Sequence, residues 1–432
     1  MKEAAIGSRL AKLRLTVSQI SKLSTTFALP MVVLALLAST VMSSAQASNV
    51  RELVPPGLAD GSGVWANIWN YPSGDIDAYC ALLRSHGVRN LFLQTSRSNM
   101  PAVAHPAELA QVIEACHRHK IRVIGWAYLE LQNPDADADK MIAAARFQSS
   151  RGERLDAIAP DLEKNLTEAK ISKFSQRLRD HLGANYPMIA VVYSPLNHYQ
   201  EVAHTPWKVL ANYYDVIAPM SYWNSRYQKL DAYDYTVATV RTIRQMTGRP
   251  DIEVHVIGDG MGSGSAAIHS FMKACKRAEA TSASIYPNQK LTAEQLNTLS
   301  RYDDYFQANS RFRLAAFREM IRSGVVQVPA GTDPSEPICR GEFYRMLSRR
   351  LHSSVPQEAL ESRAPMYSSE AFAALAQIVE TQQSARGKKR RADRWFAAPA
   401  MAEAPQVKAR DDRALNYLDA SQIVIEAGSA LR

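Results

Sequence analysis

Apolar and polar positions follow two different patterns along residues 63–297. Short runs of four to six residues are apolar at most positions and rich in β-branched side chains, as in strands buried on both faces of a parallel sheet. The segments between them carry apolar residues three and four positions apart, which predicts amphipathic helices. The strand-like runs lie at 64–69, 90–94, 123–128, 155–159, 188–193, 216–220, 252–257 and 283–286.

The number of runs decides between two α/β architectures. Eight strand and helix units in about 230 residues match the usual size of a closed (β/α)8 barrel, or TIM barrel, whereas a doubly wound open sheet usually has fewer strands. We therefore expect a TIM barrel over residues 63–297. The helix-like segments are 75–86, 106–119, 167–182, 235–246 and 265–278.

The residues after the barrel have a different pattern. Residues 298–382 carry helical signals without strand signals, and residues 383–410 are a low-complexity stretch typical of a linker. A helical pattern returns over 411–432. We expect the TIM barrel to be followed by a small helical region.

The N-terminus has the features of a secretory signal peptide. Five basic residues precede an apolar run at 27–42, and Ala45 and Ala47 supply the small residues of a cleavage site. The run is shorter than the roughly 20 residues of a spanning helix, although an uncleaved membrane anchor is the alternative. We expect residues 1–47 to be removed, 48–62 to form a linker, and the mature chain to be secreted without a transmembrane segment.

Charge and cysteine content add little to this picture. The net charge of +9 falls to +5 without the five basic residues and one acidic residue of the leader, an excess that favours anionic wall polymers or serves only solubility. No nucleic-acid-binding motif is present. We expect no metal or cofactor, and we expect buried free thiols at the four cysteines, Cys80, Cys116, Cys275 and Cys339, which lack metal or redox spacing.

The polar residues that follow each apolar run are the candidates for chemistry, because TIM barrels place catalytic groups at the C-terminal strand ends. Asp161 and Glu163 follow the fourth run two positions apart, so both point to one face, roughly 6.6 Å apart at Cα. A neighbouring carboxylate would raise the pKa of Glu163, as a general acid requires, while ion pairing with Lys164 or Arg154 is the structural alternative. The other candidates are Asn67, Asn70, Gln94, Arg97, Tyr128, Glu130, Tyr193, Asn197, Ser221, Tyr222, Trp223, Asp259, Tyr286 and Asn288.

The segment Asp156-Ala157-Ile158-Ala159-Pro160-Asp161-Leu162-Glu163 resembles the strand-four signature of family 18 glycoside hydrolases, the chitinase family, written Asp-x-x-Asp-x-Asp-x-Glu. The resemblance implies that Glu163 is the general acid. It also implies that Asp161 orients the N-acetyl group of the substrate, whose oxygen replaces an enzyme nucleophile. Met220-Ser221-Tyr222 is similar to the family's Met-x-Tyr segment, which implies that Tyr222 binds the same acetamido group.

The chain also departs from the family pattern. Ala159 replaces the middle Asp, and Trp223 stands where the family has an Asp after its Tyr. The strand-three Ser-x-Gly-Gly pattern is absent from residues 124–127, and no Trp closes strand eight. These departures favour either a distant glycosidase with another substrate or a barrel that only binds glycans.

Further carboxylates and aromatic rings near strand ends complete the candidate site. Glu130 or Asp259 would give Glu163 a conventional carboxylate partner, about 5 Å away in a retaining enzyme and farther in an inverting one. Asp259 lies in a glycine-rich loop, where a turn residue is the structural alternative. Aromatic rings would stack on sugar rings, although about half are expected in the core. We expect substrate contacts from Trp69, Tyr128, Glu130, Trp223, Asp259 and Tyr286, of which the two tryptophans would form a subsite floor.

The helical region contains a second resemblance. Residues 338–347, Ile-Cys-Arg-Gly-Glu-Phe-Tyr-Arg-Met-Leu, look like the Ile-Thr-Arg-Ala-Glu-Phe core of an S-layer homology (SLH) repeat, which implies that Arg340 contacts an anionic wall polymer. Residues 416–423 are similar to the beginning of another repeat, and residues 367–380 weakly to a repeat's second helix. Such repeats usually bury their cores against one another in threes, so a plain helical appendage is the alternative.

Together these patterns predict an exported, cell-wall-associated glycoside hydrolase. Its substrate would be a polysaccharide bearing N-acetyl groups, and its tail would bind an anionic wall polymer or peptidoglycan. The alternative is a non-catalytic S-layer or cell-envelope protein whose barrel recognises glycan, because a fold does not guarantee chemistry.

Overall fold

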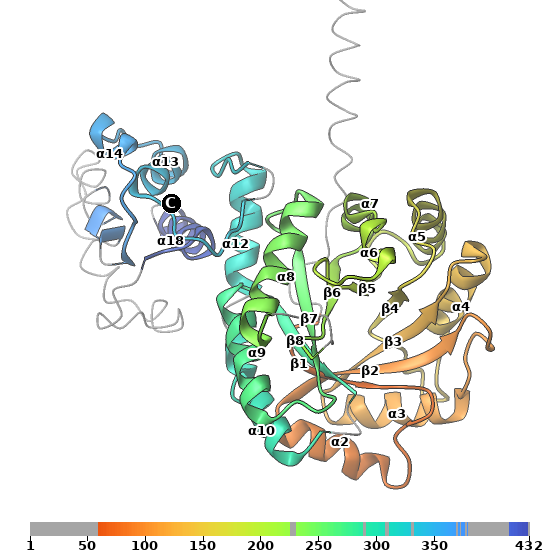
Figure 1. The fold of residues 1–432 in the computed structure, drawn as a ribbon. Coiled ribbons are helices and arrows are strands. Elements are labelled where there is room, and N and C mark those ends of the chain that lie inside the picture. The colour runs from red at the N-terminus through yellow and green to blue at the C-terminus, as the bar shows by residue number, and fades with distance from the viewer. Residues whose placement is uncertain are drawn as a thin grey trace, which may run out of the picture. The chain divides into compact units, whose positions relative to one another are not determined.

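The computed structural model contains a closed barrel of eight parallel strands in chain order, β1 to β8, with helices on its outside (Figure 1). The structure describes residues 59–224, 230–287, 291–306, 311–329, 332–378 without 369, 372, 376 and 377, and 414–430. The expected TIM barrel is confirmed. The strands are Gly61–Ala66, Val88–Arg97, Arg122–Leu129, Ala157–Leu162, Ile189–Tyr193, Val216–Ser221, Glu253–Asp259 and Ser282–Tyr286.

Each of the five helices expected around the barrel is present, and the sequence shows why they begin where they do. Asp75, Thr167 and Asp231 cap α2, α5 and α8 by accepting hydrogen bonds from first-turn backbone N–H groups. The barrel helices are α2 Ile76–Ser85, α3 Pro106–Arg118, α4 Pro134–Arg146, α5 Glu168–Leu182, α6 Gln200–Ala203, α7 Trp207–Tyr213, α8 Ala232–Thr247, α9 Ser265–Arg277, α10 Ala293–Ser300 and α11 Asp303–Tyr305.

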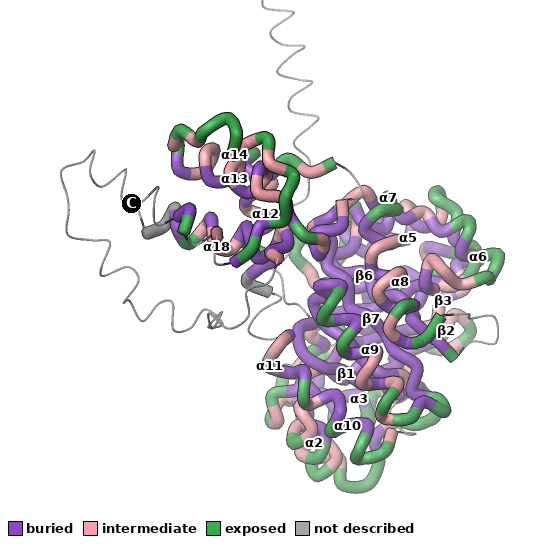
Figure 2. The backbone as a smooth tube through the Cα atoms, turned by 60° about the vertical axis from the view of Figure 1, so that its left-hand side comes forward, coloured by how far each residue is buried: buried purple, intermediate pink, exposed green. Residues whose placement is uncertain are grey.

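Alternation along the strands sorts the apolar side chains into two cores. One face of each strand packs against the surrounding helices in a large outer core, and the other fills the barrel interior. Exposed residues concentrate on the helices and loops, while the strands are buried (Figure 2). The interior core includes two residues of β3 and two of β4: Ile124, Trp126, Ala157 and Ala159. Asp161 and Glu163 continue this inward-facing set and lie where the C-terminal ends of the strands meet.

A polar cluster lies within the apolar interior and joins three strands. His255 of β7 is fully buried and lies within hydrogen-bond distance of Ser282 Oγ (2.6 Å) and Ser284 Oγ (2.7 Å) of β8. Trp65 of β1 donates its indole N–H to Ser284 Oγ at 2.7 Å. Burial lowers the pKa of His255 to about 3, so the imidazole is neutral at physiological pH.

The barrel core extends beyond residue 297, where the sequence pattern had suggested its end. Leu299 and Phe306 are fully buried members of the outer core. Asp303 forms a two-pronged ion pair with Arg89 of β2, with N–O distances of 2.9 to 3.1 Å. Helices α10 and α11 therefore belong to the barrel.

The helical region that follows has its own core, separate from that of the barrel. Its described helices are α12 Arg311–Arg322, α13 Arg340–Leu351, α14 Gln357–Glu361 and α18 Tyr417–Ala430. Three extended segments meet in a closed cycle of backbone hydrogen bonds: Ile338 N donates to Leu415 O, Leu415 N to Met366 O, and Met366 N to Ile338 O, at 2.7 to 2.9 Å. The segments around 338, 366 and 415 are thus equivalent in their backbone pairing.

The helical region contacts the barrel through buried charges. Arg313 of α12 pairs with Glu279 of the barrel (2.5 Å) and with Asp419 of α18 (2.8 Å). Arg318 of α12 pairs with Glu253 at 3.3 Å. Glu253 begins β7 and Glu279 precedes β8, so these contacts lie at the N-terminal ends of the strands.

Three further expectations concern the N-terminal and linker segments, membrane-spanning helices and the cysteines. The signal peptide at 1–47, most of the 48–62 linker and the 383–410 linker lie outside the described residues. Among the helices that are described, none is both long and apolar enough to cross a membrane. The four cysteines are free thiols, three of them buried, and Cys80 Sγ lies 3.2 Å from Cys116 Sγ.

Candidate active site

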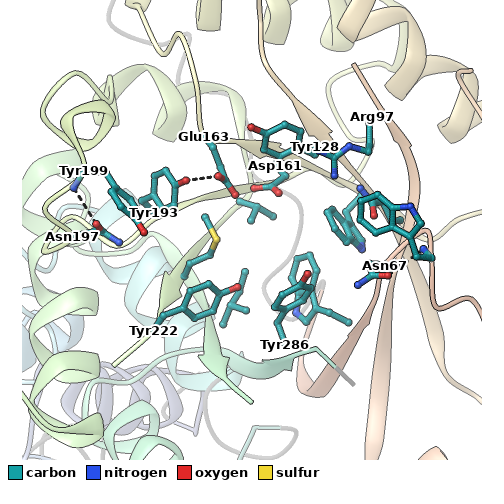
Figure 3. A pocket seen from close by; sticks show the side chains of 17 residues that line it. Asn67, Arg97, Tyr128, Asp161, Glu163, Tyr193, Asn197, Tyr199, Tyr222 and Tyr286 are labelled. Carbon is teal, nitrogen blue, oxygen red and sulfur yellow. Dashed lines mark hydrogen bonds between the residues drawn. The ribbon is translucent and has the colours of Figure 1, made fainter. Parts of the chain in front are cut away.

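A cavity of about 300 Å³ opens at the C-terminal ends of the strands (Figure 3). Eight aromatic side chains line it, together with two carboxylates, one guanidinium and three side-chain amides. This composition, apolar walls with a few polar groups, is typical of a site for a small ligand or a sugar chain. The lining residues are Trp65, Asn67, Trp69, Gln94, Arg97, Trp126, Tyr128, Asp161, Glu163, Val191, Tyr193, Asn197, Tyr199, Met220, Tyr222, Ile257 and Tyr286.

Asp161 is the second-to-last residue of β4, and its side chain faces the cavity. It pairs in register with Tyr128 of β3 and Val191 of β5, both of which line the same cavity. The side chain is 7% exposed, and its Oδ1 has no hydrogen-bond partner among the described residues. Burial raises the pKa of Asp161 well above its usual value, and the neighbouring Glu163 raises it further. A protonated or substrate-bound Asp161 is therefore favoured over a free carboxylate.

Glu163 lies two residues beyond Asp161, and the two carboxyl groups are close enough to share a hydrogen bond. Burial raises the pKa of Glu163, while a hydrogen bond donated by the Tyr193 hydroxyl to Glu163 Oε2 and the charge of Lys164 moderate the rise. Figure 3 shows Tyr193 pointing at Glu163 from β5. The raised pKa values favour retention of a proton by the pair, as an acid catalyst requires.

Tyr222 faces Asp161 and Glu163 across the cavity (Figure 3). Its ring stacks on that of Tyr286 of β8, with the ring centres 6.4 Å apart, and Tyr286 meets Trp126 edge to face at 6.5 Å. Burial raises the pKa of Tyr222 well above its usual value, and the charge of Asp161 adds to the rise. The Tyr222 hydroxyl is therefore a neutral hydrogen-bond donor.

Aromatic and cationic groups form the other end of the cavity. Arg97, the last residue of β2, pairs in register with Tyr128, and its guanidinium carbon lies 4.6 Å from the centre of the Tyr128 ring. It also lies 5.2 Å from the ring of Trp69, whose side chain is 70% exposed at the rim. An exposed indole beside a cavity provides a flat apolar surface on which a sugar ring can stack.

The structure therefore brings together Asp161, Glu163, Tyr222, Trp69, Tyr128 and Tyr286, as the sequence analysis expected. It does not bring Trp223 into the cavity. Tyr222 and Trp223 directly follow β6. The Tyr222 side chain lines the cavity, whereas Trp223 packs against Phe271 of α9 at 5.2 Å and is 7% exposed. Trp223 is a core residue and cannot form a subsite floor.

Glu130 and Asp259 also lie outside the set of lining residues. Strand β3 ends at Leu129, and Glu130 Oε2 accepts a hydrogen bond from Gln132 at 3.1 Å. Asp259 ends β7 and accepts a hydrogen bond from Met261 N at 2.8 Å, which makes it the turn residue of the structural alternative. Neither residue is among those that line the cavity.

Five of the residues named at strand ends line the cavity without having been assigned a role: Asn67, Gln94, Arg97, Tyr193 and Asn197. Alternation along β5 could have indicated Tyr193, since Ile189 and Val191 already face the interior. Asp156, the first acidic residue of the strand-four signature, lies elsewhere: its Oδ2 accepts a hydrogen bond from Val123 N at 2.7 Å near the start of β3.

The only carboxylates among the lining residues are Asp161 and Glu163, and they are neighbours on one strand. Both carboxylates lie on one side of the cavity, and the described lining has no carboxylate on the opposite side. Among the described residues, no group of three or more His, Cys, Asp and Glu side chains is arranged to hold a metal ion.

In the helical region, Arg340 lies at the start of α13 and is partly exposed. Its Nε donates to Glu370 Oε2 at 3.0 Å, and its backbone N–H donates to Ala364 O at 2.8 Å. Glu370 follows Met366 by the same four residues that separate Glu342 from Ile338 and Asp419 from Leu415. The three equivalent segments thus carry an acidic residue at the same position.

Comparison with known proteins gives matches only among solved structures: no family model and no curated protein sequence matches the chain. An endo-1,4-beta-D-mannanase from Thermotoga petrophila RKU-1 is 10% identical over 57% of this chain and all of its own, with a TM-score of 0.45. A GH18 chitinase from Pseudoalteromonas aurantia is 12% identical over 56% of this chain and 99% of its own, with a TM-score of 0.43. A chitinase-like agglutinin from Robinia pseudoacacia is 11% identical over 55% of this chain and 98% of its own, with a TM-score of 0.40.

Proposed function

We propose that this chain is an exported glycoside hydrolase that cleaves an N-acetylated polysaccharide, with Glu163 as the general acid. The observation that carries the proposal is the buried Asp161–Glu163 pair, facing Tyr222 in a cavity lined with aromatic rings. The resemblance of residues 156–163 and 220–222 to family 18 signatures agrees with this arrangement.

The proposed reaction uses a group of the substrate in place of the missing second carboxylate. Glu163 donates its proton to the glycosidic oxygen, and the bond from that oxygen to the anomeric carbon breaks. The acetamido oxygen of the same sugar bonds to the anomeric carbon, while Asp161 holds the acetamido N–H and Tyr222 donates to the acetamido oxygen. Water then attacks the anomeric carbon, the acetamido group leaves it, and the Glu163 carboxylate takes the proton from the water.

Exchange of Glu163 for Gln tests this role, because glutamine keeps the shape of the side chain but has no proton to donate. We expect turnover of N-acetylated oligosaccharides to fall by at least 10²-fold, the lower end of a general acid's contribution, while ligand binding is retained. The matched control is Glu130→Gln, which removes a carboxylate that lies just outside the cavity lining. Undiminished turnover in Glu163→Gln would exclude Glu163 as the acid.

A second candidate function is glycan recognition without hydrolysis. Ala159 is fully buried where the family signature has an Asp, and Asp161 Oδ1 has no partner among the described residues. Loss of that carboxylate alters the proton relay of the strand-four signature. Reducing ends released by the purified wild-type protein from peptidoglycan or chitooligosaccharides would rule out this candidate.

The helical region is proposed to hold the protein on the cell wall. Its three equivalent segments support the reading of residues 338–347 and 416–423 as repeat starts, and Arg340 is the proposed contact to an anionic polymer. The contacts between this region and the barrel lie at the N-terminal strand ends, opposite the cavity. Anchoring through the helical region would therefore leave the cavity accessible to polysaccharide.

A further inference from the structure

The guanidinium of Arg97 is the one charged group of the cavity lining that is not part of the carboxylate pair. It has no ion pair and no side-chain hydrogen bond with any residue that the structure describes; its contacts are the faces of Tyr128 and Trp69. A guanidinium that stacks on aromatic rings keeps its N–H groups free at its edge. The edge of Arg97 is therefore available to a ligand.

The position of Arg97 relates this free edge to the proposed point of cleavage. In register, Arg97 of β2 lies beside Tyr128 of β3, which lies beside Asp161 of β4. Two strand spacings, roughly 10 Å, separate the backbones of Arg97 and Asp161. Figure 3 shows Arg97 and Tyr128 on one side of the carboxylate pair and Tyr193 on the other. A sugar bound over Tyr128 and Trp69 would thus neighbour the sugar held by Asp161 and Tyr222.

We propose that Arg97 binds the carboxylate of an acidic sugar next to the scissile bond, so that the substrate is an anionic glycan rather than a neutral one. The inference rests on the proposed function for the location of the scissile bond. Arg97 is prearranged for this task, because the two rings fix a planar fork that pairs bidentately with a carboxylate.

The alternative role for Arg97 is to lower the pKa values of Asp161 and Glu163 without contacting a ligand. The charge of Arg97 lowers the pKa of Asp161 and Glu163, although burial outweighs it for both groups. Neither carboxylate forms an ion pair with Arg97, whose guanidinium contacts only the rings of Tyr128 and Trp69 among the described residues. A binding measurement that needs no catalysis separates the two roles.

The experiment uses the full chain carrying Glu163→Gln, so that no ligand is hydrolysed. The probes are a tetrasaccharide of alternating N-acetylglucosamine and N-acetylmuramic acid, the methyl ester of the same compound, and chitotetraose. The ester keeps the sugar chain of the acid but has no charge, and it adds one methyl group to each carboxyl group. We expect the acid to bind at least about tenfold more tightly than either neutral compound, as for a charge-assisted bidentate contact.

Variants then test whether Arg97 causes the tighter binding of the acid. In Arg97→Gln the ratio of acid to ester affinity should fall to within about twofold, and Arg97→Lys should retain part of it because a lysine keeps the charge but not the fork. Lys208→Gln, which removes an exposed charge of α7 outside the cavity, should keep the full ratio. If Arg97→Gln fails to fold, the partial loss of the acid preference expected in Arg97→Lys supplies the same assignment, and an undiminished preference in Arg97→Lys overturns the inference.

An oligosaccharide of alternating N-acetylglucosamine and glucuronic acid distinguishes the source of the carboxylate. Preference for it supports an acidic glycan of the uronate type, and preference for the muramic compound one of the wall type. Equal affinity for the acid and its ester, or no binding of any acidic probe, overturns the inference. Because these are binding ratios, a failed hydrolysis assay with wild-type protein would refute the proposed function without affecting them.

Discussion

At the scale of single residues, the candidate site combines features that oppose stability. Asp161 is buried with one oxygen unpaired, and its neighbour Glu163 is an acid of raised pKa. Buried groups of this kind are kept where chemistry requires them, and elsewhere they are replaced by neutral side chains. The loss of stability caused by burying the Asp161 carboxyl group can be measured.

Asp161→Asn should make the protein more stable at neutral pH. The folded-state pKa of Asp161 is raised above its ordinary value of 3.8, so the unfolded chain ionises first and folding is penalised as pH rises through that window. Below pH 3.8 both states are protonated and the penalty vanishes. We expect the melting temperature of Asp161→Asn to exceed that of wild type by roughly 2–4 °C at pH 7 and the gain to disappear near pH 3.5. A variant that melts lower than wild type at pH 7 would mean that the Asp161 carboxylate is stabilised in the fold.

At the scale of elements, the eight strands could be predicted because each is a continuous apolar run, and runs of this kind have few other uses in a soluble chain. The inward set along β4 followed from alternation alone, and it placed Asp161 and Glu163 correctly. The expectation for Trp223 was wrong, because the residue next to an inward-facing Tyr222 points away from the cavity and packs against Phe271. The contact between Tyr193 and Glu163 could not be predicted, because the register between β4 and β5 cannot be inferred from the sequence of either strand alone.

The cluster of His255, Ser282, Ser284 and Trp65 connects β7, β8 and β1, and it predicts an acid sensitivity of the barrel. The pKa of His255 falls from its ordinary 6.5 to about 3 on folding, so its contribution to stability is complete above pH 6.5 and is lost as pH falls toward 3. Urea unfolding should show wild-type stability falling faster than that of His255→Gln between pH 6 and 4, by up to about 1.4 kcal/mol per pH unit. Equal slopes for the two proteins would show that the imidazole is protonated in the fold.

At the scale of the whole molecule, the barrel and the helical region have separate apolar cores and meet through buried ion pairs. The sequence indicated two parts but placed their boundary too early, because α10 and α11 have helical patterns like those of the region after them. Burial of Leu299 and Phe306 decides that they belong to the barrel.

Two truncations test this boundary. A chain ending at residue 297 loses the Leu299 and Phe306 side chains from the outer core, and a chain ending at residue 310 keeps them. We expect the shorter chain to be less stable in urea by about 4 kcal/mol or more, since each buried side chain of this size contributes roughly 2–5 kcal/mol. Equal stability of the two chains would place the barrel's end where the apolar runs alone suggested.

The same 310 truncation tests the proposed wall anchor. The mature full-length protein should sediment with purified cell walls, whereas the truncated barrel and Arg340→Ala should stay in solution, because a guanidinium pairs bidentately with carboxylates or phosphates. Arg349→Ala, which changes an arginine at the other end of α13, is the matched control and should still sediment. Sedimentation of the truncated barrel would assign wall binding to the barrel.

The most direct test of the central claim is the anomeric configuration of the first product, followed by proton NMR during hydrolysis of an N-acetylated β-linked oligosaccharide. The cavity lining offers one carboxylate pair on one side of the sugar, so the substrate's acetamido group must make the first attack and water the second. Two inversions restore the original configuration, and the account predicts a newly formed reducing end that is β. An α product would show direct attack by water and a second carboxylate acting as base, and the absence of any product would leave the barrel as a glycan-binding domain.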